Sequence, residues 1–455
     1  MRTFHLVLVN TLLASLVNNF VWFALTFWVF LETGSVLATA IIGGGYMLIM
    51  SFSGMFFGTY VDRHRRRTSM LVSSAISLVM FGLAGLVYAV APAGSLQDLA
   101  HPAFWALVIT ALIGAVAGNL RLVALSTTVT LLVPEESHDR ANGLVGTSNG
   151  IVFAMTSVLS GFGVGFAGMG WSLAAAIVGT ALVLVHMASI RFEEAAPQPA
   201  ADAPRFIDFG GAMQAIRFVP GLLALLIFST FNNFLGGVFM ALMDPYGLSL
   251  MPVETYGIVL AITSSGFIVG GVLVARRGLG RNPVRTLLLA NVVMWVVTIL
   301  FPIRFEVLPL VIGFFTYLTL APVAEASEQT IVQKVVPFTE QGRVFGFAQT
   351  LETAAAPVTA FLIGPIAQFW VMPSMTDGAL AELIGPWFGT GPQRGLSLIF
   401  IVTAAIGLAV VLVALRSRPY RDLSRRYLEA PDQAPDDLSG GPALEAVPGQ
   451  PSHAA

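Results

Sequence analysis

Three carboxylates and one arginine lie in apolar segments of the chain, where a charged group is costly and usually serves a function. The carboxylates are Glu325, Glu328 and Glu352, and the arginine is Arg121. A carboxyl group in a low-dielectric environment favours its neutral form, so it can take up and release a proton. At about 1.5 Å of rise per residue, Arg121 and Glu325 would share a depth. The pattern predicts either proton transfer through at least one carboxylate or a permanent ion pair between Arg121 and Glu325.

Carboxamides form a second group of candidate residues. The sequence "VNNF" at 17–20 is repeated as "FNNF" at 231–234, and Asn119 lies two residues before Arg121. Such amides either bind a polar ligand group or join helices by hydrogen bonds worth about 0.6 kcal/mol each. Both interpretations stay open for Asn18 and Asn232. Because neighbouring residues on a helix point about 100° apart, we expect one member of each pair to face a given cavity.

The composition indicates how these residues are positioned. Hydrophobic residues make up 56% of the 455 residues and charged residues only 11%, which is typical of an integral membrane protein. The chain contains no cysteine, and its net charge of −2 gives no reason to expect a nucleic-acid partner. After Arg2 and His5 the apolar run exceeds a signal-peptide core and lacks a convincing cleavage site, so we expect the first helix to be retained.

The uncharged stretches are long enough for transmembrane helices, which need about 20 apolar residues each. We expect twelve spans, at 4–31, 36–61, 68–91, 103–133, 142–167, 172–190, 220–243, 255–275, 284–303, 307–335, 344–371 and 395–415. The fifth and sixth are separated at "GMGWS", where Gly168 and Gly170 favour a turn. An even number of spans puts both termini on one side. Of the 23 basic residues, all but Arg121, Arg304 and Arg394 fall on that side, which predicts cytoplasmic termini.

The chain is built from two related halves. Besides the asparagine pairs, the spacing from Pro134 to Arg140 recurs from Pro337 to Arg343. Such duplication is common in secondary transporters, whose binding site lies between the halves. We therefore expect a six-helix bundle at 1–191, a Pro- and Ala-rich cytoplasmic linker at 192–218, a second six-helix bundle at 219–418 and a disordered cytoplasmic tail at 419–455.

A family resemblance rests on specific residues. The stretch "GTYVDRHRRRT" at 58–68 resembles the signature between helices two and three of the major facilitator superfamily: a glycine, an aspartate four residues on and a basic cluster. The stretch "EQTIVQKVVPFTEQGRVFGFAQTLE" resembles the macrolide-efflux type of drug:proton antiporter within it. This resemblance implies an all-α membrane protein with twelve transmembrane helices in two pseudo-symmetric bundles.

The resemblance also implies roles for individual residues. In this superfamily helices one, four, seven and ten line a central cavity, and the loop after helix two latches the halves in the outward-facing state. The substrate-binding candidates are Asn18, Asn19, Trp22, Asn119, Arg121, Asn232 and Asn233. The proton-coupling candidates are Glu325, Glu328 and Glu352, and the latch candidates are Gly58, Asp62, Arg63 and Arg66.

The expected function is secondary active export of lipophilic or amphipathic small molecules across the cytoplasmic membrane, in exchange for protons. An exporter of an endogenous metabolite such as a siderophore or lipid, and a transport-inactive membrane sensor, are the alternatives. The sequence has no phosphate-binding loop, no metal-ligand motif and no cluster of Ser, His and Asp, so we expect no enzyme activity and no cofactor or metal. The expected partners are the substrate, protons and membrane lipids, and the expected state is a monomer.

Overall fold

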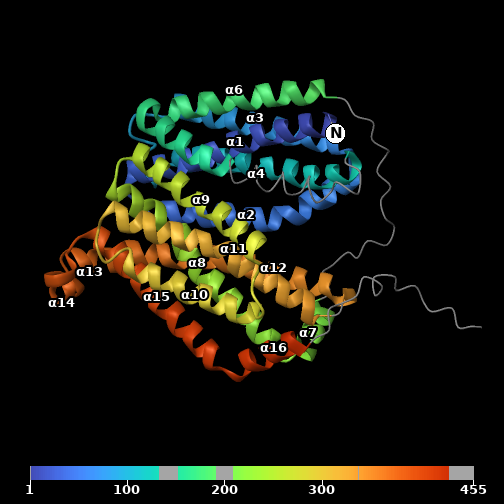
Figure 1. Ribbon diagram of the computed structural model, residues 1–455. Coiled ribbons are helices and arrows are strands. Elements are labelled where there is room, and N and C mark those ends of the chain that lie inside the picture. Colours follow the sequence, from blue (N-terminus) through green and yellow to red (C-terminus); the bar gives the residue numbers. More distant parts are fainter. Residues whose placement is uncertain (1, 133–151, 191–208, 337, 430–455) are drawn as a thin grey trace, which may run out of the picture.

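The computed structural model describes residues 2–132, 152–190, 209–336 and 338–429, and these residues form an almost entirely helical protein. Figure 1 shows two layers of long helices, one from each half of the chain, with the N-terminus at the end of the bundle shared by α7 and α16. We call this end the terminal end and the other end the distal end.

The N-terminal half provides long helices that run between the two ends. They are α1 (Arg2–Thr33), α2 (Val36–Arg63), α3 (Arg66–Val90), α4 (Pro102–Leu132), a helix over 152–162 that continues into η2 (Gly163–Ala167), and α6 (Gly168–Ser189). Gly168 separates the last two because its φ of +77° breaks the helical path, which confirms the turn predicted there.

The C-terminal half repeats this arrangement and adds short helices. Its long helices are α8 (Leu222–Leu250), α9 (Val253–Arg277), α10 (Pro283–Leu300), α11 (Val307–Val335), α12 (Phe338–Ile366) with η3 (Ala367–Val371), and α15 (Pro392–Arg416). The short helices are α7 (Phe209–Phe218), α13 (Met372–Thr376), α14 (Ala379–Phe388) and α16 (Arg418–Glu429).

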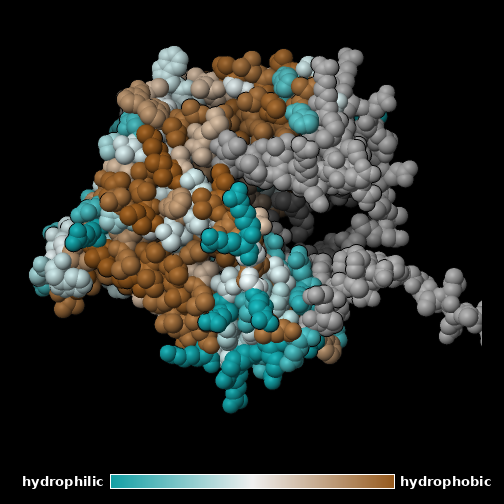
Figure 2. Space-filling view, in the orientation of Figure 1, coloured by the Kyte–Doolittle hydropathy of each residue, from teal (hydrophilic) through white to brown (hydrophobic). Residues whose placement is uncertain are grey.

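Each expected span coincides with a long helix where it is described, with residues 142–151 of the fifth span outside the described residues, so the helical membrane fold is confirmed. Within the described residues ten segments are long and apolar enough to cross a membrane. One of them, Val152–Ser189, contains both the fifth and the sixth expected span. Helix α2 is not among the ten, because only its shorter apolar part, Val36–Met50, qualifies. Figure 2 shows the hydrophobic surface that such helices present to lipid.

One expectation outside the spans was wrong in part, because the tail predicted to be disordered from 419 begins with helix α16. The linker predicted at 192–218 contains helix α7, and residues 192–208 and 430–455 lie outside the described residues. Both short helices are amphipathic, and Ile216 and Leu423 are buried in one cluster at the terminal end. Burial of that apolar face stabilises helices too short to be stable alone.

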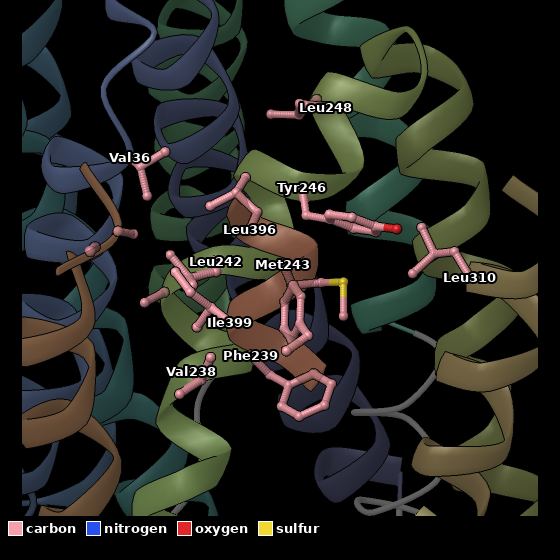
Figure 3. Close-up of a cluster of buried hydrophobic side chains, with 14 of the residues drawn as sticks. Val36, Val238, Phe239, Leu242, Met243, Tyr246, Leu248, Leu310, Leu396 and Ile399 are labelled. Carbon is pink, nitrogen blue, oxygen red and sulfur yellow. The ribbon is translucent and has the colours of Figure 1, made fainter. Parts of the chain in front are cut away.

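The two halves contact each other near the distal end. At this end α2 packs against α8, α12 and η3, and α9 packs against η2. One apolar cluster continues across the boundary, from Phe23, Phe27 and Val36 of the first half to residues of α8, α11 and α15 in the second (Figure 3). The backbone amide of Val36 donates to Oε1 of Gln368 at 3.0 Å, which also links the halves.

Glycines permit the closest approach between the halves. A Cβ atom at Gly257 would lie 2.5 Å from the carbonyl oxygen of Ser157, and one at Gly161 would lie 2.7 Å from that of Val253. Neither distance leaves space for a side chain, so α9 and the helix over 152–162 meet backbone to backbone.

Candidate functional site

Three polar side chains from three helices meet within the C-terminal half. Glu328 of α11 lies within hydrogen-bonding reach of Glu352 of α12 and of Ser229 of α8. Both carboxylates are partly buried, and Oε1 of Glu352 is buried without a hydrogen-bond partner among the described residues. The sequence predicted both carboxylates, but it gave no signal for Ser229, because serine is common in such helices.

Glu325 lies one turn of α11 before this carboxyl pair. It acts electrostatically on both Glu328 and Glu352, although its own side chain is exposed. Nε2 of Gln329 donates to Oε1 of Glu325 at 3.4 Å. The structure therefore brings together all three carboxylates that the sequence selected, with Glu328 and Glu352 in the more enclosed positions.

Two ionised carboxylates in contact repel each other strongly where little water screens them. A pair with this geometry is stable when it shares a proton, as in other paired carboxyl groups of proteins. The arrangement can therefore bind and release a proton inside the helical bundle.

Arg121 lies elsewhere, and the ion pair with Glu325, one of the two alternatives predicted from the sequence, is not formed in this conformation. The side chain is only 1% exposed and is held inside the N-terminal half. Its guanidinium donates to Oδ1 of Asn10, to Oγ of Ser74 and, at 3.0 Å, to the carbonyl oxygen of Met70. These bonds stabilise the packing of α4 against α1 and α3, and Nε of Arg121 is buried without a hydrogen-bond partner among the described residues.

Asn10 is the residue that sequence reasoning missed here. It is fully buried, and its Nδ2 also donates to the carbonyl oxygen of Val183 at 3.0 Å, which links α1 to α6. A carboxamide in the first apolar span was visible in the sequence, but it had no counterpart in the second half. A polar cavity of about 10 Å³ adjoins this network and is lined by Asn18, Arg121, Thr180 and serines of α3.

The asparagine pairs divide between the two interpretations. Asn18 packs against Gly118 of α4, where a Cβ atom would collide with its amide. Oδ1 of Asn232 accepts a hydrogen bond of 3.1 Å from Nε1 of Trp295 on α10. Asn232 thus joins two helices of its own bundle by a hydrogen bond, as the packing interpretation predicted, whereas Asn18 lies against α4 and beside the polar cavity, so both interpretations stay open for it.

The second asparagine of each pair points away from that packing. Asn19 is partly buried, and Asn233 is exposed, with its Nδ2 donating to the carbonyl oxygen of Ser229 at 3.1 Å. On α4, the partly buried Asn119 contacts the sulfur atom of Met50 on α2.

Aromatic side chains from both halves lie at the edge of the apolar cluster that joins them. Trp22, Phe153, Phe231 and Phe234 are partly buried against it. Trp22 packs edge-to-face on Phe23 and beside Tyr46, with centroid distances of 4.7 and 5.2 Å. Its indole Nε1 is buried without a partner among the described residues, as is Nε of Arg121, so both predicted binding residues keep a donor available.

The latch candidates lie at the terminal end, where α2 ends at Arg63 and α3 begins at Arg66. The surroundings of Gly58 and the side chains of Asp62 and Arg63 are outside what the structure describes. Arg66 is partly buried, and the neighbouring Arg67 donates to the carbonyl oxygens of Ala188 and Ile190, both at 2.8 Å. Arg67 therefore satisfies carbonyl groups at the end of α6.

A second buried carboxylate was missed because the expected span ended one residue before it. Asp244 of α8 is 9% exposed, and its Oδ1 accepts a hydrogen bond of 2.8 Å from the hydroxyl of Tyr256 on α9. The ring of Tyr256 packs edge-to-face on Phe27 of α1, with centroids 5.5 Å apart. The pair thus lies where the halves meet.

Across the described residues, no cluster of His, Cys, Asp or Glu could hold a metal ion.

Comparisons with known proteins agree with this architecture. A family model described as Major Facilitator Superfamily matches residues 7–360. No curated protein matches the sequence. Among solved structures, a bacterial homolog of the human lysosomal transporter Spinster, in an inward-facing and unoccupied conformation, is 15% identical with a TM-score of 0.65, over 95% of this chain and 99% of that one.

Two further solved structures share the fold. The nucleoside transporter NupG is 12% identical with a TM-score of 0.68, covering 91% of this chain and 99% of that one. A D-xylose-proton symporter is 12% identical with a TM-score of 0.60, covering 89% and 97%. Because the family model matches more than half of the sequence and the helices form the same two bundles, this chain belongs to the major facilitator superfamily of membrane transporters.

Proposed function

We propose that the chain is a secondary active transporter that exports lipophilic or amphipathic small molecules, of the kind represented by macrolide drugs, in exchange for protons. The observation that carries this proposal is the contact of Glu328 with Glu352, on helices that the sequence had already selected for proton coupling.

Proton coupling requires a group whose protonation changes during the transport cycle. The carboxyl pair is suited to this because separating its two members would change how firmly they hold the shared proton. Its members lie on α11 and α12, and α12 also packs against α2 of the other half. A movement of the halves that shifts α12 relative to α11 would therefore alter the distance between Glu328 and Glu352.

The substrate class is inferred from the side chains at the boundary of the halves. Apolar, aromatic surface comes from Trp22, Phe153, Phe231 and Phe234. A few polar groups come from Asn19 and Asn233, which are close to these aromatic residues in the sequence. A surface of this composition suits a large, mainly apolar molecule with some hydrogen-bonding groups.

Alternating access supplies the transport cycle. The halves contact each other near the distal end, and Figure 1 shows them diverging toward the terminal end. With both termini in the cytoplasm, as the basic residues predict, this is an inward-facing state. In the outward-facing state the segment that contains Gly58, Asp62, Arg63 and Arg66 would hold the terminal end closed.

The proposal is tested by efflux from cells that express the protein. Cells are loaded with the lipophilic cation ethidium or with radiolabelled erythromycin, and efflux is followed with and without a protonophore. We expect efflux above that of cells expressing the Glu328→Gln variant, and we expect the protonophore to abolish the difference.

The alternatives give different results. An exporter of an endogenous metabolite would transport neither probe but would still release a compound into the medium, which mass spectrometry of the medium would detect. For a transport-inactive sensor, purified protein in liposomes would show no counterflow of any probe. Efflux of the probes that persists without a proton gradient would contradict proton coupling.

A further inference from the structure

Helix α16 has two faces of opposite character, and nothing in the transport mechanism accounts for the second. Its inner face packs on the end of the C-terminal bundle: Leu423 is 2% exposed, and Oγ of Ser424 accepts a hydrogen bond of 2.5 Å from Nδ2 of Asn282. The outer face carries exposed arginines. The inner contacts therefore hold α16 against the C-terminal bundle with its arginines on the outer surface.

Arginines of α16 line one side of an open surface hollow at the terminal end. A surface hollow of about 360 Å³ is lined by Arg418, Arg421, Asp422 and Arg425. Arg425 forms an ion pair of 3.0 Å with Asp422, so the acid and this base compensate each other. Arg418 and Arg421 thus leave the hollow with excess positive charge, and hydrophilic surface is visible around α16 at the lower edge of the molecule in Figure 2.

An apolar cleft lies under α16, and its lining includes residues of this helix other than those that line the hollow. It has a volume of about 40 Å³ and lies between α8, α10, α15 and α16. Its lining includes Leu225, Phe228, Leu288, Ala414 and Tyr420. The cleft is small, so it admits a segment of a thin hydrocarbon chain and not a bulky ring system. Tyr420 lies next in the sequence to Arg421, which lines the hollow.

The location is a membrane boundary. Helix α15 is the last apolar span and ends at Arg416, two residues before α16 begins. An amphipathic helix at this point lies at the depth of the lipid headgroups, with its apolar neighbours facing the acyl chains. Positive side chains on the outer face of α16, with an apolar cleft under the same helix, fit a ligand that is anionic at one end and a hydrocarbon at the other.

We propose that this surface is a binding site for an anionic phospholipid of the leaflet on the side of the chain termini. The phosphate lies in the hollow against Arg418 and Arg421, and one acyl chain lies along the cleft beside Phe228 and Ala414. Clusters of arginine on an amphipathic helix next to a membrane span recognise anionic lipids in this way. Free phosphate would use only the hollow, and a neutral lipid only the cleft.

The experiment uses the full chain, purified in a neutral detergent. The thermal unfolding midpoint is followed while dioleoylphosphatidylglycerol or dioleoylphosphatidylcholine is added. We expect a saturating rise with the anionic lipid and a much smaller rise with the neutral one. Replacing two arginines, Arg418→Gln with Arg421→Gln, should weaken the apparent affinity for phosphatidylglycerol by about 30-fold.

The matched control is Arg276→Gln with Arg277→Gln, which removes the same amount of charge from two exposed positions in the last turn of α9. It should bind the anionic lipid as the native protein does. Ala414→Phe fills the cleft and should weaken binding several-fold while both arginines remain. If the double variant does not purify, Arg418→Gln and Arg421→Gln alone carry the same test with a smaller loss.

Three results would overturn the proposal. If inorganic phosphate raised the unfolding midpoint as much as phosphatidylglycerol does, the acyl chain would make no contribution to binding. An equal loss of affinity in the control pair would make the effect one of total charge. Unchanged affinity in the Arg418/Arg421 variants would place the lipid elsewhere.

Discussion

Gly257→Ala should shift the protein away from the conformation described here. Gly257 lies on α9 where this helix meets the other half of the molecule. The added methyl group would lie 2.5 Å from the carbonyl oxygen of Ser157 and 3.2 Å from Cα of Gly161. Both neighbours belong to the helix over 152–162, and backbone cannot rotate aside as a flexible side chain can.

The magnitude follows from the missing space. Ordinary van der Waals contact begins at 3.4 Å, so the methyl group is about 0.9 Å too close to the carbonyl oxygen. Overpacking of this kind costs about 1–3 kcal/mol, and the cost falls only on the state in which the distal end is closed. An alternative state with the distal end open would therefore gain population relative to the closed state by about 5- to 150-fold.

The assay is a distance measurement between the halves. The chain has no cysteine, so spin labels can be placed at Asp98 and Asp377, which are both exposed. Gly257→Ala should move the distance distribution between the two labels to longer values. Gly271→Ala is the matched control, because it lies on the same helix and nothing is within 4 Å of its added Cβ atom. Identical distributions for native protein, Gly257→Ala and Gly271→Ala would refute the closed contact between α9 and the helix over 152–162.

The remaining predictions concern individual contacts. Asn10→Ala removes hydrogen bonds to the buried Arg121 and to the carbonyl oxygen of Val183, so the free energy of unfolding should fall by about 1.5–3 kcal/mol. Asn233→Ala, at an exposed position, should change it little. Thermal unfolding in detergent measures both variants. Tyr256→Phe removes the hydrogen bond to the buried Asp244 and should destabilise the protein by a similar amount, with Tyr88→Phe at a partly buried tyrosine as comparison. A cysteine at Asp98 should react with an impermeant reagent from outside intact cells and one at Arg277 only after permeabilisation; the opposite pattern would reverse the predicted topology.

The helices could be predicted from sequence because the bilayer permits few solutions. Every backbone group in lipid must be bonded internally, so a long apolar run must be a helix, and charged residues delimit it. The short helices α7 and α16 follow no such rule, since their stability comes from Ile216 and Leu423 packing on a bundle that the sequence alone does not place.

The candidate site was only partly predictable, for a related reason. Apolar surroundings identify a costly side chain, so Glu325, Glu328, Glu352 and Arg121 were visible. Which groups meet depends on how each helix is rotated, and an error of one residue turns a side chain by about 100°. Arg121 therefore proved to face Asn10 and Ser74 within its own half, while Glu328 and Glu352 face each other.

The central claim is that the carboxyl pair exchanges protons for substrate, and proton movement in liposomes tests it most directly. Purified protein is reconstituted with a pH-sensitive dye trapped inside, and ethidium is added outside without an imposed pH gradient. For the native protein, ethidium entry should drive protons out, so the internal pH should rise. The control Glu306→Gln, at an exposed position, should behave in the same way. Glu352→Gln keeps the shape of the side chain but cannot ionise, so it should give no pH change. A Glu352→Gln protein that unfolds at the native temperature and still moves protons against ethidium at the native rate would contradict the account.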